Sequence, residues 1–197
     1  MNLLLRKSAM YPLLKLTVAL FISSAAAAGF AQQKIVLAQS EIVFVSKQMG
    51  VPVEGRFKKF DGQINFDAAK LDTSKVNFTV DMGSASLGIP ETDAELPKST
   101  WFSTVKFPQA IFTSTSIKAL GGGKYDVAGK LSIKGQTRDV VVPVAMVQTG
   151  PTTVATGVLP VKRLAFKIGE GEWADTSMVA DDVQVKFKFS LTGVSKL

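Results

Sequence analysis

Apolar and polar residues alternate along nearly the whole chain between Ile35 and Leu191. Successive side chains of an extended strand point to opposite faces, so a period of two predicts sheets with one apolar face to bury. The clearest case is residues 183–191, VQVKFKFSL, where five apolar side chains share one face. A helix of 3.6 residues per turn would not separate the two kinds in this way. The pattern predicts an all-β chain.

The alternation and its breaks predict eight strands, at about 35–47, 52–66, 75–82, 110–119, 124–134, 137–149, 154–168 and 182–194. Most connections are short, and glycine-containing segments at 120–124 and 134–137 are typical of hairpin turns between antiparallel strands. Short helical turns are expected within 91–104 and 172–178. No linker or repeat divides the chain, so residues 32–197 are predicted to form one domain.

Eight antiparallel strands form either a sandwich or a closed barrel. Gly62 and Gly129 lie in phase with the apolar faces of their strands. They either leave room beside a cavity or relieve bends in a curled sheet. Both interpretations favour a barrel.

Residues 1–31 have the features of a secretory leader. The positive residues Arg6, Lys7 and Lys15 precede an apolar run at 16–28. Small residues at 25–31 suit a cleavage site. A membrane anchor would need roughly 20 apolar residues, and this run is shorter. We expect an exported mature protein that begins near Gln32 and has no stable membrane insertion.

Composition excludes several kinds of chemistry. The chain contains no histidine and no cysteine, which excludes a Ser-His-Asp hydrolase, a thiol nucleophile and the best nitrogen and sulfur ligands for metals. Of the formal charge of +7, three positive charges belong to the leader. The remaining charges of both signs are interleaved, so no nucleic-acid partner is expected.

A few charged residues invite a functional interpretation. Ser103 and Lys106 match a Ser-x-x-Lys pattern, but the companion motifs of serine acyltransferases are missing. Asp181 and Asp182 are adjacent, so on a strand they would face opposite ways, and the start of a strand is the expected role. Arg163 lies in an apolar segment and is expected to pair with one of these aspartates. No enzyme, cofactor or metal site is predicted.

Several blocks together carry a family resemblance: GVPVEGRFKKFDG at 50–62, WF at 101–102, FPQAIFTS at 107–114, GKLSIKGQT at 129–137, RLAFKIG at 163–169, and Trp173. In this set and order the chain resembles the YceI family of bacterial polyisoprenoid-binding proteins. The resemblance implies a lipocalin-like, eight-stranded antiparallel barrel with one or two short helices. It also implies a periplasmic, non-enzymatic protein that holds a long isoprenoid or related lipid, such as a quinone or its precursor. A homodimer is compatible with the family.

Many relatives carry a histidine before the glycine of the first conserved turn, which here reads Gln48-Met49-Gly50.

On this basis the cavity is predicted to be lined by Phe44, Ile64, Phe66, Phe78, Phe112, Leu131, Ile133, Phe187 and Phe189. Phe57 and Phe60 are three residues apart and cannot share a face of a regular strand, so a bulge or bend is expected between them. That bend either aims Arg56, Lys58 and Lys59 at a ligand head group or leaves them as solvated edge charges.

Three functions remain open from the sequence. The first is a carrier of an isoprenoid lipid. The second is a stress-response or protein-interaction module with a packed, ligand-free barrel. The third is an enzyme acting on a bound lipid, for which the alternation offers no clear inward acid or base.

Overall fold

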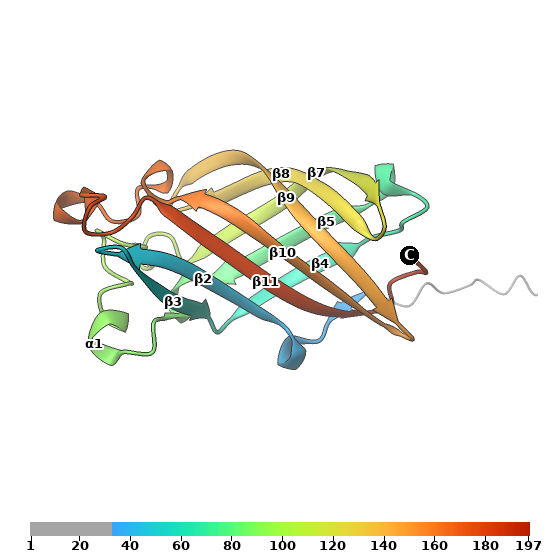
Figure 1. Ribbon diagram of the computed structural model, residues 1–197, viewed down its shortest axis with the longest axis horizontal. Coiled ribbons are helices and arrows are strands. Elements are labelled where there is room, and N and C mark those ends of the chain that lie inside the picture. The colour runs from blue at the N-terminus through green and yellow to red at the C-terminus, as the bar shows by residue number, and fades with distance from the viewer. Residues whose placement is uncertain (1–32) are drawn as a thin grey trace, which may run out of the picture.

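The protein forms a single antiparallel sheet that curls into an elongated barrel (Figure 1). The computed structural model describes residues 33–197, so the predicted leader lies outside the described residues. The strands are β1 (Lys34–Ile35), β2 (Glu41–Gln48), β3 (Val51–Phe57), β4 (Phe60–Asn65), β5 (Lys75–Asp81), β6 (Ala85–Ser86), β7 (Gln109–Gly121), β8 (Lys124–Ile133), β9 (Gln136–Thr149), β10 (Thr152–Lys162) and β11 (Asp182–Thr192).

Hydrogen-bonded strands follow the order β4-β5-β7-β8-β9-β10-β11-β2-β3-β6, and β1 pairs with β11. The sheet therefore has a seam between β3 and β4, where no backbone ladder is found among residues 33–197. Next to β1, the end of β4 is held by the Gln33 side chain, whose amide nitrogen donates to the Phe66 carbonyl at 2.7 Å and whose oxygen accepts from the Phe66 N–H at 2.9 Å. These two hydrogen bonds of the side-chain amide take the place of backbone ladder bonds beside β4.

The predicted all-β antiparallel barrel is confirmed, although the structure has eleven strands rather than eight. The expected strand 35–47 is interrupted by the 3-10 turn η1 (Leu37–Gln39). The expected strand 52–66 divides into β3 and β4 at Lys58 and Lys59, so the bend between Phe57 and Phe60 is confirmed. The two-residue strands β1 and β6 are too short to show any periodicity.

Two other predicted elements are shorter than expected. β10 ends at Lys162, and Arg163 begins the 3-10 turn η4 (Arg163–Phe166) instead of lying within a strand. The segment 91–104 contains only the short helix α1 (Pro90–Asp93), followed by hydrogen-bonded turns. The turn expected within 172–178 is present as η5 (Gly171–Ala174), while η2 (Leu71–Thr73) and η3 (Met82–Ser84) flank β5. No helix among residues 33–197 is long and apolar enough to span a membrane.

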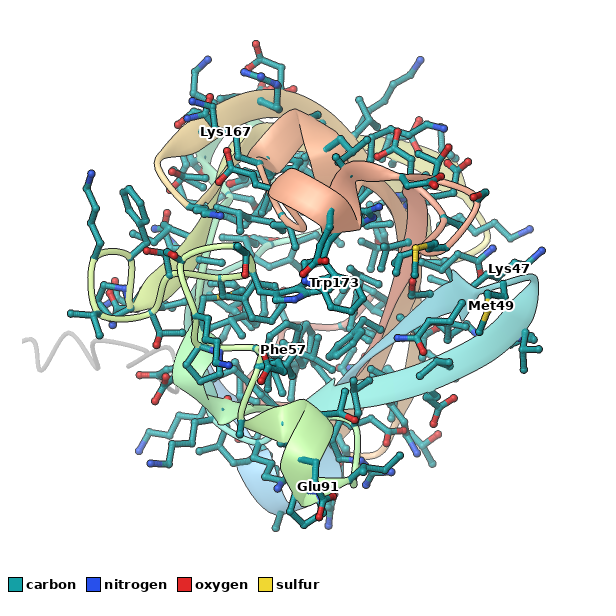
Figure 2. All side chains as sticks on the ribbon, turned by 90° about the vertical axis from the view of Figure 1, so that its left-hand side faces the viewer. Lys47, Met49, Phe57, Glu91, Lys167 and Trp173 are labelled. Carbon is teal, nitrogen blue, oxygen red and sulfur yellow. The ribbon has the colours of Figure 1, made fainter. Side chains whose placement is uncertain are left out.

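One end of the barrel is covered by the loop that follows β10, which we call the cap (residues 163–181). It lies at the left of Figure 1 and faces the viewer in Figure 2. The cap is held by the β2–β3 hairpin, since the Met49 N–H donates to the Met178 carbonyl at 2.8 Å and the Ala180 N–H to the Lys47 carbonyl at 2.9 Å.

Lys134 ties the cap to two further segments. It occupies the β8–β9 hairpin turn at a φ of 47°, next to Gly135 at 73°. Its buried ammonium donates to the Ser99 carbonyl at 2.7 Å, the Lys167 carbonyl at 2.6 Å and the Glu170 carboxylate at 2.9 Å. This hydrogen bond and the charge of Lys134 lower the pKa of Glu170 below its ordinary value.

Arg163 organises the interior of the cap. Its side chain is 2% exposed, and all five guanidinium N–H groups donate to backbone carbonyls, those of Ala180, Ile168, Gly169, Trp173 and Val179. Burial lowers the pKa of this guanidinium, and the charge of Asp181 opposes that shift.

The expected ion pair of Arg163 with Asp181 or Asp182 is wrong. Asp181 accepts from the Leu164 N–H at 2.9 Å, and Asp182 pairs with Lys162 at 2.7 Å at the start of β11. Carbonyl oxygens satisfy the guanidinium because the cap wraps around it, an arrangement that residue spacing does not reveal.

We expect Arg163→Lys to destabilise the fold by about 2–4 kcal/mol, because a lysine offers three donors in place of five and leaves buried carbonyls unpaired. Urea denaturation followed by circular dichroism would measure the loss. Lys162→Arg, at the neighbouring exposed position, is the control and should unfold with the wild type. Equal midpoints for all three proteins would contradict this role of Arg163.

Candidate binding cavity

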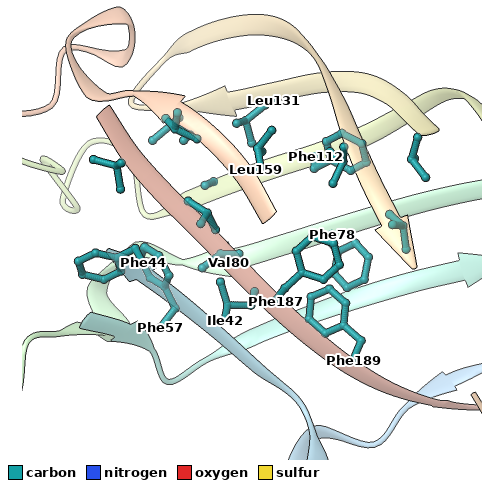
Figure 3. Close-up of a pocket in the computed structure, with 18 of the residues that line it drawn as sticks. Ile42, Phe44, Phe57, Phe78, Val80, Phe112, Leu131, Leu159, Phe187 and Phe189 are labelled. Carbon is teal, nitrogen blue, oxygen red and sulfur yellow. The ribbon is translucent and has the colours of Figure 1, made fainter. Parts of the chain in front are cut away.

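An apolar cavity runs along the inside of the barrel (Figure 3). Its free volume is about 260 Å³. It is lined by 33 residues, of which only Ser46, Tyr125 and Arg163 carry a hydroxyl or a charge on the side chain, apart from the indole N–H of Trp101. Such a surface favours a ligand that is apolar over nearly its whole length.

All nine residues predicted to line the cavity do lie on its wall: Phe44, Ile64, Phe66, Phe78, Phe112, Leu131, Ile133, Phe187 and Phe189. They come from β2, β4, β5, β7, β8 and β11 and from the residue that follows β4. Their contact with a ligand stays a prediction.

Inward-facing glycines determine how the phenylalanine rings lie. Gly62 is directly opposite Phe78 in the β4–β5 ladder, and a Cβ built on Gly62 would lie 2.7 Å from that ring. A Cβ on Gly129 would lie 2.6 Å from the Phe112 ring and 2.5 Å from the Thr113 carbonyl oxygen. The room left by these glycines is therefore occupied by a ring.

Two more pairs repeat this arrangement. Gly55 lies opposite Phe44 in the β2–β3 ladder, and Gly157 lies opposite Phe187 in the β10–β11 ladder. A Cβ on either glycine would overlap the partner ring. Such cross-strand pairs cover the exposed glycine backbone with an aromatic face. They also let large rings lie along the wall.

The rings also contact one another in the middle of the barrel. Phe78 and Phe187 both stack on Phe189, with centroids 4.4 Å and 5.0 Å away, and Phe60 lies 5.7 Å from it at a tilt. Figure 3 shows Phe78, Phe187 and Phe189 grouped together inside the wall. This aromatic stack limits the free volume of the cavity.

Aromatic pairs also lie towards the two ends of the barrel. Phe66 meets Tyr125 edge-to-face at 5.1 Å on the side away from the cap. Beneath the cap, Trp101 contacts Trp173 at 5.5 Å and Phe44 contacts Phe57 at 5.2 Å. Figure 2 shows Trp173 and Phe57 near the centre of the capped end. Aromatic rings thus narrow the interior towards both ends.

The polar groups of the lining differ in their freedom to bind. Arg163 has no donor left, because all five are bonded to carbonyls. The hydroxyl of Ser46, on β2, is buried and has no hydrogen-bond partner within residues 33–197. A buried hydroxyl without a partner has an unmet hydrogen bond that a ligand could supply.

Arg56, Lys58 and Lys59 do not reach this cavity. All three are exposed and line a groove on the outside of the seam, together with Leu37, Ser40 and Glu41. Phe57 and Ile42 separate the groove from the cavity, since both residues line the two spaces. The position agrees with solvated edge charges, and a head-group role for these residues stays a prediction.

The part of the wall built by β9 and β10 was not predicted from the sequence. Val142, Val144 and Met146 of β9, and Leu159 and Val161 of β10, line the cavity. Their period of two was present, but apolar residues on both faces of these strands hid which set points inward.

The described residues hold no cluster of metal ligands. No three carboxylates lie close enough to hold a metal ion within residues 33–197. The Ser103–Lys106 segment is a tight turn, in which the Lys106 N–H donates to the Ser103 carbonyl at 2.9 Å and the ammonium lies over the Phe107 ring.

The turn Gln48-Met49-Gly50 forms the tip of the β2–β3 hairpin. Met49 has a φ of 47° and is 78% exposed, outside the cavity. Neither Gln48 nor Met49 is among the residues that line the cavity.

The comparisons with known proteins agree with this architecture. The sequence model of the YceI-like domain matches residues 34–191, so the chain belongs to the YceI family. The crystal structure of BcnA from Burkholderia cenocepacia is 47% identical and superposes with a TM-score of 0.77 over 80% of this chain and 99% of that one. A domain from Saccharophagus degradans, described as polyisoprenoid-binding and implicated in plant cell wall breakdown, has a TM-score of 0.67 at 16% identity over 82% of this chain and 98% of its own. At that identity the likeness shows the fold alone.

Curated relatives match over shorter stretches. A UPF0312 protein from Shewanella denitrificans is 36% identical over 114 residues, which cover 57% of this chain and 60% of the relative. Protein YceI from Salmonella arizonae is 36% identical over 96 residues, which cover 49% of this chain and 50% of the relative. The chain thus spans about half to three fifths of the length of these relatives.

We expect Gly62→Ala to destabilise the protein by about 1–3 kcal/mol, because its Cβ would force Phe78 off the wall and overpack the interior. Thermal unfolding would measure this loss. The double substitution Gly62→Ala with Phe78→Leu gives back the space, so it should recover part of the lost stability. If Gly62→Ala alone is neutral, or if the double variant is the sum of two independent losses, the ring does not depend on the glycine.

Proposed function

We propose that this protein binds one long-chain lipid of the isoprenoid class inside the barrel and acts as a carrier or store for it, without catalysis. The observation that carries the proposal is the continuous apolar lining of a cavity enclosed by one domain. A solidly packed barrel would leave no such space. The family membership and the polyisoprenoid-binding description of the Saccharophagus degradans domain support the ligand class.

The free energy of transferring an isoprenoid chain from water into the apolar cavity favours binding of this ligand class. Burying one CH₂ group stabilises a complex by about 0.8 kcal/mol, so one five-carbon unit contributes roughly 3–4 kcal/mol before ordering costs. Small-molecule pockets span about 300–1,000 Å³, and the free volume of about 260 Å³ is below that range. A long isoprenoid would therefore need the Phe78, Phe187 and Phe189 stack to move apart.

The predicted leader supports an exported, periplasmic site of action. A lipid of this class is almost insoluble in water, so an enclosed carrier would keep its chain from water during exchange. A quinone or quinone precursor would add a polar ring at one end of the same apolar chain.

Lipid extraction tests the proposal directly. The full-length chain is expressed with its leader in a Gram-negative host, and the soluble periplasmic fraction is purified. Organic extracts are then analysed by mass spectrometry. We expect a stoichiometric isoprenoid lipid, and the intact protein mass should show loss of residues 1–31. An empty extract together with failure to bind added geranylgeraniol would overturn the lipid proposal and favour the packed interaction module.

Ser46 gives a direction for the bound lipid. Its free hydroxyl lies on β2, which the cap contacts at Lys47, so we expect the polar end of the ligand to lie at the capped end. Ser46→Ala should weaken binding of geranylgeraniol by about three- to tenfold, the value of one hydrogen bond, and leave binding of the corresponding hydrocarbon unchanged.

Quenching of intrinsic tryptophan fluorescence would report both affinities, since Trp101 lines the cavity. Ser116→Ala, at an exposed position on β7, is the matched control. Equal weakening of the alcohol and the hydrocarbon by Ser46→Ala would show a change in packing and contradict the proposed hydrogen bond.

A further inference from the structure

The outer face of β9 and β10 lacks the polar character of an ordinary solvated sheet. No charged residue occurs between Asp139 and Lys162. The residues that alternate with the cavity lining point outward, and we call them the outer strip: Val141, Pro143, Ala145 and Val147 on β9, with Val154, Thr156, Val158 and Pro160 on β10. Antiparallel sheets normally alternate apolar inside and polar outside.

The strip is contiguous and exposed. Val154 pairs with Val147 and Thr156 pairs with Ala145 in the β9–β10 ladder, so the two rows are neighbours. Val141, Val147 and Val158 are 56%, 66% and 42% exposed. A contiguous exposed apolar surface marks an interaction site more often than scattered apolar residues do.

The charges beside the strip are mainly positive once ion pairs are considered. Lys130 pairs with Asp139 at 2.8 Å, and Lys162 pairs with Asp182 at 2.7 Å, so these two aspartates are neutralised. On β8, Asp126 lies opposite Pro143 and Lys124 opposite Ala145, so one charge of each sign borders the strip there. On β11, Lys188 lies opposite Thr156 and Lys186 opposite Val158.

These two lysines are exposed, and neither makes an ion pair with any residue that the structure describes. The strip itself has no acidic residue that could receive them from a second copy of the chain. An apolar surface with free lysines along one side is complementary to a surface that is itself apolar and anionic.

The wall beneath the strip is also unusual. The β9–β10 ladder ends at the Val144 and Gly157 pair, and no further pair joins the two strands. Pro143 and Pro160, which have no N–H to donate, lie beyond that point. On the inner side of the same segments, Val142 and Leu159 line the cavity. At the Pro143 and Pro160 end of the strip, the wall between strip and cavity is therefore not closed by a β9–β10 backbone ladder.

We infer that the outer strip docks on the surface of an anionic lipid bilayer, with Lys186 and Lys188 against the phosphate head groups. The inference deepens the proposed function and rests on it for the choice of a bilayer as the partner. Docking by this face would place a part of the barrel wall with an incomplete ladder against the membrane in which an isoprenoid resides.

Vesicle flotation with ligand-free mature protein tests the docking. The probes are vesicles of phosphatidylglycerol with phosphatidylcholine, and vesicles of phosphatidylcholine alone. We expect binding to the anionic vesicles that weakens with salt. Val147→Asp with Val158→Asp should reduce this binding at least about tenfold, because two charges would enter the apolar contact.

Lys186→Gln with Lys188→Gln should also reduce binding about tenfold or more and remove the preference for anionic lipid. The matched controls are Val105→Asp, on the loop that follows α1, and Lys75→Gln, on β5; both positions are exposed and outside the strip. Circular dichroism would establish that each variant is folded.

Each result can be separated from the lipid-binding proposal, because the strip variants do not touch the cavity. Wild-type protein that binds geranylgeraniol but no vesicles would overturn the docking and leave the proposed function standing. Wild-type protein that binds vesicles through the strip but takes up no isoprenoid would overturn the proposed function instead. Strip variants that change a dimer to a monomer in light scattering, with vesicle binding unchanged, would make the strip a subunit interface and overturn the docking.

Discussion

The packing of phenylalanine rings on inward-facing glycines is the contact on which the interior of this barrel depends. Phe78 on Gly62 and Phe112 on Gly129 illustrate it, and a Cβ at either glycine would collide with the ring. Without a side chain at the glycine, a large ring lies along the wall instead of filling the lumen. The barrel can then bury much aromatic surface for stability and still enclose free space. That combination matters in a chain without cysteine, whose stability must come from its core.

The capped end uses a different interaction, in which long cationic side chains satisfy backbone carbonyls. Arg163 and Lys134 are both buried, and together they connect the cap, the loop at Ser99 and the β8–β9 turn. The two short 3-10 turns of the cap satisfy only some of its carbonyls, and these side-chain donors satisfy others. Because Arg163 has no donor left, the only charge on the cavity lining is unavailable to a ligand. The lining therefore stays functionally apolar apart from the hydroxyls and the indole N–H.

The sequence predicted the cavity wall well where one face of a strand was clearly polar. Phe187 and Phe189 were assigned correctly because Lys186 and Lys188 occupy the opposite face of β11. The sequence did not reveal which face of β9 and β10 lines the cavity. Valines occupy both faces of these strands, so periodicity cannot identify the inward one. The sequence also failed for Arg163, whose partners are carbonyls from a loop that folds around it. Carbonyls are present at every position, so residue types do not identify such partners. The nine predicted cavity residues lie on the wall, while the three predicted head-group residues lie on the outside of the seam.

The sequence by itself determined an antiparallel all-β barrel, the bend between Phe57 and Phe60, and the absence of histidine and thiol chemistry. These follow from local periodicity and composition, which depend only on neighbouring residues. Only the tertiary structure decided how much space remains inside, because that depends on rings and glycines brought together across strands. It also decided that the capped end is held by Arg163 and Lys134, and that an apolar strip on β9 and β10 faces outward above an incomplete ladder. Each of these depends on contacts between residues that are distant in sequence. Strand pairing and the curling of the sheet bring those residues together.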